Sequence, residues 1–181
     1  WTKKSIRKAK AIVAVSQFTK NEIIKTYGID KKKIFIAYNG VGQARMIPDR
    51  IGSKILEKFK IEKPYFLYLG TLKPNKNIPF IIKAMTNFPN HKLVIAGKKG
   101  WLFEDIFKLV TELKLEQQII FTDFINETEK WTLYKNAQAL VVPSLYEGFG
   151  IPAIEAQKTK LPVIASNIEV YKEILGESAI L

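Results

Sequence analysis

Residues 139–155 read ALVVPSLYEGFGIPAIE, which combines a short apolar run, a loop with two glycines and the start of a helix. This order is typical of a strand–loop–helix unit in a parallel sheet. Glycine lets a backbone approach a ligand closely, and the free N–H groups at a helix start bind anions. The stretch therefore predicts an α/β fold with a ligand site at the end of one strand.

Two carboxylates, Glu147 and Glu155, lie on either side of this glycine turn. A carboxylate repels an anion but accepts hydrogen bonds from hydroxyl groups. Within the apolar helix start, Glu155 is costly to bury unless some group donates to it. A nucleotide sugar fits this arrangement, because it has phosphates in the middle and hydroxyls at both ends. The alternative is a pair of surface glutamates beside a turn.

The rest of the chain repeats this alternation of short apolar runs and helical patterns. Strands are predicted over 11–15, 34–38, 65–69, 92–96, 118–122, 138–142, 161–165 and 179–181. Helices are predicted over 17–27, 53–59, 78–86, 102–114, 127–136, 150–158 and 168–175. Such alternation indicates a Rossmann-like parallel sheet with crossover helices, in which ligands bind at the carboxyl ends of the strands.

The pattern divides the chain into three segments. Residues 1–41 hold one strand–helix–strand unit with no element expected before it. Residues 42–63 lose the strong pattern and are interpreted as a linker with one short helix. Residues 64–181 carry the regular alternation and are expected to form the ligand-binding domain.

A second candidate loop, residues 70–77, reads GTLKPNKN. Lys76 stands at the N-terminus of the next helix, where positive charge is unfavourable. A bound anion would resolve that conflict, so Lys76 is a candidate phosphate ligand and Lys73 a weaker one. The alternative is a solvated lysine in a lysine-rich chain. Gly97, at a later strand end, either permits close approach of a base or sugar or forms a plain turn.

The glycine spacing also matches the dinucleotide pattern G-x-G-x-x-A at Gly148, Gly150 and Ala153. In a dinucleotide-binding domain this pattern follows the first strand, and an acidic residue about 20 positions later holds the ribose. Here it follows the fourth strand of the regular region. Glu169 has the required spacing but lies beyond the next strand. NAD binding is therefore the weaker alternative to a nucleotide sugar.

Composition excludes several classes of protein. The chain has no cysteine, so thiolate metal sites are excluded, and its single histidine and lack of paired aspartates argue against a dedicated metal site. Residues 1–63 carry 16 basic and 5 acidic side chains, whereas the remainder is nearly balanced. Only three of the basic residues are arginine, which disfavours reading of nucleic acid bases. An anionic membrane surface is one candidate partner, and a lysine-rich solvated face is the alternative.

Several motifs together resemble glycosyltransferase family four, the group 1 retaining transferases of GT-B fold. The spacing of Glu147 and Glu155 resembles the E-x7-E motif of that family, and residues 69–77 resemble its phosphate loop. Residues 14–20 and 38–41 resemble the end of the family's first domain. The resemblance covers essentially the whole chain.

The resemblance implies transfer of a hexose from a UDP- or GDP-sugar to a hydroxyl acceptor, sugar or lipid-linked. It implies synthesis of cell-surface polysaccharide or glycolipid in the cytoplasm, at the inner face of the membrane, without metal or further cofactor. Glu147 would hold donor sugar hydroxyls, Lys76 would neutralise the leaving diphosphate, and Glu155 would bind the ribose. The other implied donor-binding positions are Gly70, Thr71, Lys73, Gly97, Phe124, Ile125, Gly148, Phe149, Gly150 and Ile151.

Two positions depart from the family pattern. Thr71 and Asn75 stand where many members have arginine. The loss of these cations favours a second hypothesis, a non-catalytic module that binds nucleotide sugars. Because residues 1–41 match only the end of the first domain, we expect this chain alone to bind donor without turnover.

Overall fold

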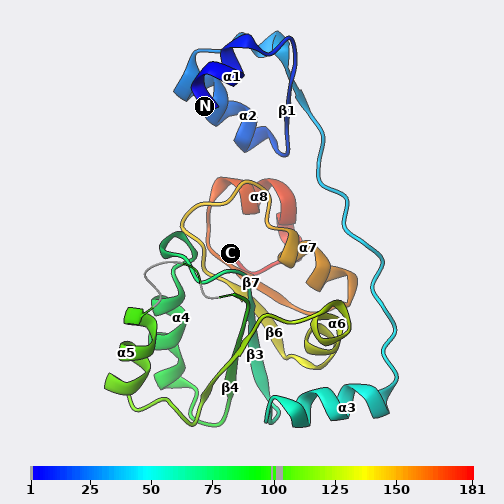
Figure 1. The fold of residues 1–181 in the computed structure, drawn as a ribbon, viewed down its shortest axis with the longest axis vertical. Helices are drawn as coiled ribbons and strands as arrows, with labels where there is room; N and C mark the ends of the chain where they lie inside the picture. Colours follow the sequence, from blue (N-terminus) through cyan, green and yellow to red (C-terminus); the bar gives the residue numbers. More distant parts are fainter. Residues whose placement is uncertain (1, 99, 101–103) are drawn as a thin grey trace.

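The computed structural model describes residues 2–98, 100 and 104–181 (Figure 1). Within them, β1 (Ile12–Ala14) and β2 (Ile34–Ile36) form a parallel pair, and a second parallel sheet has the order β5-β4-β3-β6-β7. The strands of this larger sheet are β3 (Tyr65–Leu69), β4 (Lys92–Ala96), β5 (Ile119–Asp123), β6 (Ala139–Val142) and β7 (Val163–Ala165). The α/β class with a parallel sheet is confirmed.

Helices connect the strands. They are α1 (Thr2–Lys8), α2 (Gln17–Tyr27), α3 (Asp49–Lys58), α4 (Ile78–Ala84), α5 (Glu104–Glu112), α6 (Glu127–Asn136), α7 (Ile151–Lys158) and α8 (Glu169–Leu175). Short 3₁₀ helices are η1 (Lys31–Lys33), η2 (Pro74–Lys76), η3 (Met85–Asn87) and η4 (Gly176–Ser178). In Figure 1, α4 and α5 lie on one side of the larger sheet, and α3 and α6 lie on the other.

Both faces of the larger sheet are buried, which explains why its strands are apolar without alternation. Leu67 of β3 faces the cluster that contains Trp131 of α6. Its neighbour Tyr68 points the opposite way, into the cluster that contains Ile82 of α4. Successive side chains of one strand thus fill two cores, as the pleat requires.

The order of the larger sheet reverses beside β3. The chain first builds β4 and β5 outward from β3, and then places β6 on the other side of β3 and β7 beyond it. The register pairs Leu67 with Leu140. Loops that leave the carboxyl ends of β3 and β6 therefore diverge at this point, which is where open α/β sheets bind ligands.

Most predicted elements are present, and α2 and α6 have the predicted bounds. Helix α2 begins and ends as its sequence indicates: Ser16 accepts a hydrogen bond from the N–H of Thr19, and Gly28 ends the helix in the left-handed conformation. The predicted strand at 179–181 is reduced to a single bridge between Ile164 and Ile180.

Other bounds differ from the predictions. The expectation of no element before residue 11 was wrong, because α1 forms there although its lysine-rich sequence has no apolar periodicity. Helix α3 begins at Asp49, four residues earlier than predicted, with the acidic side chain in its first turn. The first predicted residues of the helix at 102–114 lie outside the described residues, and α5 begins at Glu104.

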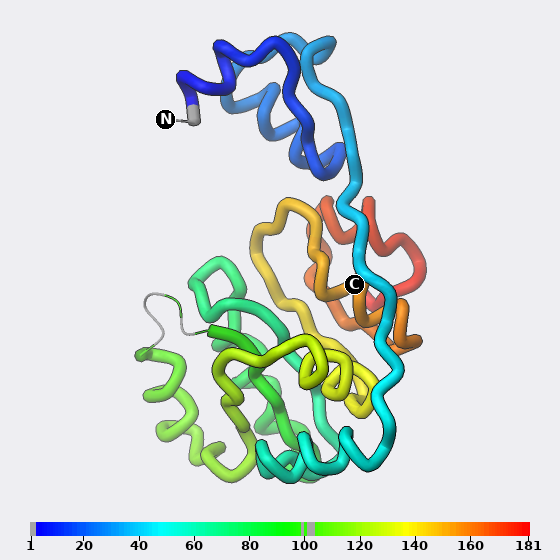
Figure 2. The backbone as a smooth tube through the Cα atoms, turned by 45° about the vertical axis from the view of Figure 1, so that its right-hand side comes forward, coloured from blue at the N-terminus to red at the C-terminus, as the bar shows by residue number. Residues whose placement is uncertain are grey.

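The part of the chain from α1 to β2 is called the N-terminal unit here. Residues 37–48 have no regular secondary structure and run as an extended segment from this unit to α3 (Figure 2). Helix α3 packs against α6, where Lys58 pairs with Glu129 at 2.6 Å and Lys135 pairs with Asp49 at 2.8 Å. The segment predicted as a linker is thus attached at its end to helix α6.

Gly97 offers a test of how closely the loops at the strand ends are packed. A Cβ at Gly97 would lie 2.1 Å from the carbonyl oxygen of Gly70, and φ at Gly97 is +148°. Replacing Gly97 with alanine should therefore lower the free energy of unfolding by about 2 kcal/mol or more, because backbone must move. Urea denaturation measures this loss.

Gly40→Ala is the matched control, because a Cβ there meets nothing within 4 Å. Equal stability of the Gly97→Ala and Gly40→Ala variants would contradict the close packing of the two loops.

Candidate functional site

A pocket of about 240 Å³ lies between the loops that follow β3 and β6. It is at the point where the strand order reverses. Its lining residues are Tyr68, Leu69, Gly70, Thr71, Lys73, Lys76, Val142, Ser144, Glu147, Pro152 and Tyr171. Two loops that the sequence singled out separately thus form one site, which we call the Lys76–Glu147 pocket.

Lys76 and Glu147 form an ion pair within this pocket. Both side chains are mostly buried, with 21% and 18% of their surface exposed. Ser144 supports the pair, because its hydroxyl donates to Oε1 of Glu147 at 3.0 Å. The negative charge that the position of Lys76 requires is therefore supplied by Glu147, and no bound anion is needed to explain that lysine.

Backbone contacts tie the two loops to each other. The N–H of Leu145 donates to the carbonyl oxygen of Asn75 at 2.9 Å. The side-chain amide of Asn75 donates in return to the carbonyl oxygen of Tyr146 at 3.2 Å. Since Asn75 precedes Lys76 and Tyr146 precedes Glu147, these bonds set the relative positions of the two charged residues.

Two buried tyrosines form the floor of the pocket. Burial, reinforced by the negative charge of Glu147, raises the pKa of both Tyr68 and Tyr171, so both hydroxyls stay protonated. The ring of Tyr171 lies against Gly150, where an added Cβ would come within 2.6 Å of Cε1. Gly150 also has φ of +93°, so glycine is required there both by backbone conformation and by the ring.

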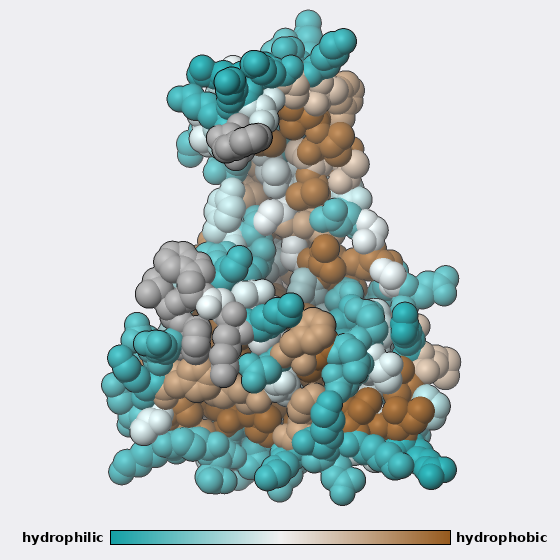
Figure 3. Space-filling model, viewed as in Figure 1, coloured by the Kyte–Doolittle hydropathy of each residue, from teal (hydrophilic) through white to brown (hydrophobic). Residues whose placement is uncertain are grey.

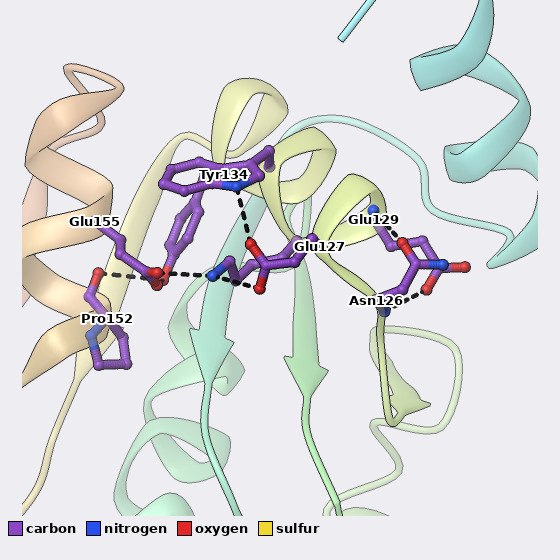
Figure 4. Close-up of polar contacts among 8 residues, drawn as sticks. Asn126, Glu127, Glu129, Tyr134, Pro152 and Glu155 are labelled. Atoms are coloured by element: carbon purple, nitrogen blue, oxygen red, sulfur yellow. Dashed lines mark hydrogen bonds and ion pairs between the residues drawn. The ribbon is translucent and has the colours of Figure 1, made fainter. Parts of the chain in front are cut away.

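Glu155 contacts side chains of helix α6 (Figure 4). Lys130 donates to its Oε1 at 2.7 Å, and the hydroxyl of Tyr134 donates to its Oε2 at 3.1 Å. Lys130 also pairs with Glu127 at 2.9 Å, and burial raises the pKa of Tyr134. The donors that a buried Glu155 needs are thus present in the protein.

A separate hollow of about 570 Å³ contains Glu155 in its lining. Residues 42–45 form one side of it, and Glu127, Lys130 and Trp131 form the other. The two glutamates of the E-x7-E spacing therefore line different hollows.

Three further predicted positions, Gly97, Phe124 and Ile125, lie outside the linings of these two hollows. Gly97 lies against the backbone of Gly70, so its close approach is to protein. Phe124 is 67% exposed, with the ammonium of Lys98 at 4.8 Å from its ring centre, and Ile125 packs onto the core. These positions line neither hollow.

The glycine turn itself contacts the N-terminal unit. The carbonyl oxygen of Gly148 accepts from the hydroxyl of Ser16 at 2.8 Å. Phe149 is buried, and its ring lies 6.1 Å from that of Tyr38. Ile151 begins α7 and is 41% exposed.

The sequence did not single out Ser144, Tyr68, Tyr171, Lys130 or Tyr134. Ser144 could have been found, since it lies three residues before Glu147 in the same loop. The other four come from helices or strand interiors, where an aromatic residue or a lysine gives no signal of its contact with a distant carboxylate.

The described residues contain no cluster of histidine, aspartate and glutamate side chains that could hold a metal ion. None of the helices in this part of the chain has the length and apolarity needed to cross a bilayer.

Two family models match the chain. The model described as "Glycosyl transferases group 1" matches residues 53–179, and that described as "Glycosyltransferase Family 4" matches residues 1–45. The chain therefore belongs to the group 1 glycosyltransferases, which confirms the resemblance seen in its motifs.

Relatives and solved structures agree with this family. The chain is 34% identical over 180 residues to the O-antigen chain mannosyltransferase RfbU of Salmonella typhimurium, covering 98% of the chain and 48% of the relative. It is 29% identical over 190 residues to the O-antigen chain mannosyltransferase B of Escherichia coli, with the same coverage. The chain thus spans about half the length of these relatives.

The structure of Anabaena Alr3699/HepE, solved with UDP and glucose, superposes with a TM-score of 0.83 at 21% identity. The match covers 93% of this chain and 47% of that protein. It confirms the GT-B type of fold.

The contact between Lys130 and Glu155 can be tested through stability. Lys130→Met should lower the free energy of unfolding by about 2 kcal/mol, because it leaves a buried carboxylate without its cation. Adding Glu155→Gln to Lys130→Met should recover part of this loss. Thermal and urea denaturation of the single and double variants measure both effects.

Lys108→Met is the control, because Lys108 pairs with Asp105 at 3.5 Å on an exposed face. It should change stability by less than about 0.5 kcal/mol. A loss at Lys130 no larger than at Lys108 would contradict the structural role assigned to Lys130.

Proposed function

We propose that the whole protein transfers a hexose from a UDP- or GDP-sugar to a hydroxyl acceptor. This chain spans about half the length of its relatives. The observation that carries the proposal is the Lys76–Glu147 pocket at the point where the strand order reverses. The names of the relatives, both O-antigen chain mannosyltransferases, support an acceptor in cell-surface polysaccharide or glycolipid synthesis. Residues 64–181 would form the donor side, joined by 42–63 to a first domain that ends with 1–41.

In this proposal the ion pair exchanges partners when donor binds. Lys76 turns from Glu147 to the diphosphate and neutralises the charge that develops as the bond to the leaving group breaks. Glu147 is then free to accept hydrogen bonds from hydroxyls of the sugar, with Ser144 holding one of its oxygens. Thr71 and Lys73 line the same pocket and complete the contact with phosphate.

The start of α7 supplies the second group of phosphate contacts. The N–H groups of Phe149, Gly150 and Ile151 stand at the beginning of an eight-residue helix, where the helix dipole is positive. Glu155 would bind the ribose through lone pairs that remain beside Lys130 and Tyr134. No metal or further cofactor takes part in this proposal.

Calorimetric titration of the full-length protein with UDP, GDP and NAD tests the class of donor. We expect one of the two nucleoside diphosphates to bind and NAD not to bind. Lys76→Ala should lower kcat with the matching sugar nucleotide by about 100-fold or more, because charge in the leaving group is no longer neutralised. Glu147→Gln should also lower activity.

Lys83→Ala provides the matched control, since Lys83 is an exposed lysine of α4. It should leave the rate unchanged. If the full-length protein binds neither UDP nor GDP, the proposed function is wrong.

A non-catalytic module that binds nucleotide sugars is the second hypothesis. Thr71 and Asn75 favour it, because neither supplies the cation that arginine would. Normal binding of UDP or GDP with no turnover of any donor, together with unchanged affinity in Lys76→Ala, would favour this module. The NAD hypothesis has less support, because Glu169 is exposed on α8 and pairs with Lys172.

We also propose that the protein works in the cytoplasm at the inner face of the membrane. The basic residues of α1 and η1 support this, and Figure 3 shows hydrophilic side chains over the outer end of the N-terminal unit. Vesicles with anionic lipid should sediment the full-length protein at low salt, and neutral vesicles should not. Added salt should reverse the binding. Equal sedimentation with both kinds of vesicle would contradict this proposal.

A further inference from the structure

Two side chains of the N-terminal unit form hydrogen bonds to one backbone carbonyl of the loop that contains Glu147. The carbonyl oxygen of Gly148 lies 2.8 Å from Oγ of Ser16 and 3.2 Å from Oγ1 of Thr19. The two hydroxyl oxygens are 2.9 Å apart. Each hydroxyl has a single proton, and the carbonyl can only accept. Both hydroxyls can therefore donate to Gly148, or one can donate to the other, which then donates to Gly148.

A second contact joins the same helix to α8. The carboxylate of Glu173 accepts from the N–H of Gln17 at 2.6 Å and from the N–H of Phe18 at 2.8 Å. These N–H groups belong to the first turn of α2, where no partner exists within the helix. The positive end of the helix dipole adds to the attraction for the carboxylate. Side-chain oxygens of Ser16 and Glu173 thus accept hydrogen bonds from the backbone N–H groups of the first turn of α2.

These contacts bridge parts of the chain that are far apart in sequence. Ser16 and Gly148 are 132 residues apart, and Gln17 and Glu173 are 156 residues apart. Figure 1 shows α2 facing α8 across the junction of the two units. Ser16 is fully buried there. Phe18 adds an edge contact with Tyr146, at 5.4 Å between ring centres.

Because the peptide bond is planar, the contact at the Gly148 carbonyl also fixes the direction of the next N–H, which is part of the proposed donor site. In a trans peptide the C=O and the following N–H point in opposite directions within one plane. Holding the carbonyl of Gly148 toward α2 therefore turns the N–H of Phe149 away from α2. Within the described part of the chain, that N–H has no backbone or side-chain acceptor. It also follows Glu147 by two residues, at the start of α7.

We propose that Ser16, Thr19 and Glu173 are positioning residues that couple the approach of α2 to the orientation of the Glu147 loop. When α2 is docked, the two hydroxyls fix the Gly148–Phe149 peptide, and its N–H is presented to the phosphate or sugar of the donor. When α2 moves away, this peptide loses its restraint, and the donor site loses one oriented N–H. The inference rests on the proposed function for its ligand, but the docking itself can be measured without one.

The hydroxyls can be removed with little change in shape. Thr19→Val deletes one hydroxyl and keeps the branched side chain, and Thr19→Ser restores it. Ser16→Gly deletes the other at small cost to the helix, because glycine is tolerated at an N-cap. Thr26→Val makes the same replacement at an exposed position of α2 and serves as the control.

The first experiment measures affinity in the full-length protein. We expect Thr19→Val with Ser16→Gly to weaken binding of UDP or GDP, whichever the unaltered protein binds, by about tenfold, from two lost hydrogen bonds. Glu173→Gln should weaken it in the same direction. Thr19→Ser and Thr26→Val should bind normally. Unaltered affinity in the double variant would overturn the coupling.

The second experiment measures docking without a nucleotide. Residues 1–181 contain no cysteine, so Lys25→Cys in α2 and Thr111→Cys in α5 place a pair of spin labels once any cysteine elsewhere in the full-length protein has been replaced by serine. The label-to-label distances in the full-length protein should be narrowly distributed, and they should broaden when Thr19→Val and Ser16→Gly are added. A distance distribution that stays equally narrow would contradict the role of these hydroxyls in docking α2. If neither UDP nor GDP binds, the proposed function is wrong, and this second measurement still decides whether the hydroxyls dock α2.

Discussion

The position of β6 beside β3 is the constraint on which the site depends. The chain must return across the sheet to pair Leu67 with Leu140, and this return places the loops after β3 and β6 next to each other. Lys76 and Glu147 meet only because of that return, since they are 71 residues apart in the chain. The apolar strands are buried on both faces of the sheet, and their packing fixes the positions of these two loops.

Local rules predicted much of the fold. Short apolar runs and helix caps identified the α/β class, and residues such as Ser16 and Gly28 set the ends of α2 correctly. Prediction failed where local sequence is not decisive. Helix α1 was missed because its sequence has no apolar periodicity. The strand predicted at 179–181 was not formed, because only Ile180 pairs with a neighbouring strand, through a single bridge to Ile164.

The candidate site was predicted as a set of loops but not as a set of contacts. Strand ends and glycine turns mark loops in the sequence, so both halves of the Lys76–Glu147 pocket could be identified. Burial of Glu155 was also foreseeable, but its partners were not. Lys130 lies 25 residues away on a different helix, and only the crossover of α6 and α7 brings it to the carboxylate. A buried acid in a sequence therefore shows that a donor is needed without showing whether protein or ligand provides it.

The pairing of Lys76 with Glu147 also affects how an anion would reach the pocket. Two opposite charges in contact form a dipole, whose field falls off faster with distance than that of a single charge. The pair therefore exerts little attraction beyond the Debye length, about 8 Å at physiological salt. The excess of 16 basic over 5 acidic residues in positions 1–63 gives a net charge that does not cancel in this way, and its attraction for anions extends further at lower salt. The net charge of the chain and the paired charges of the pocket thus lie in different parts of the sequence.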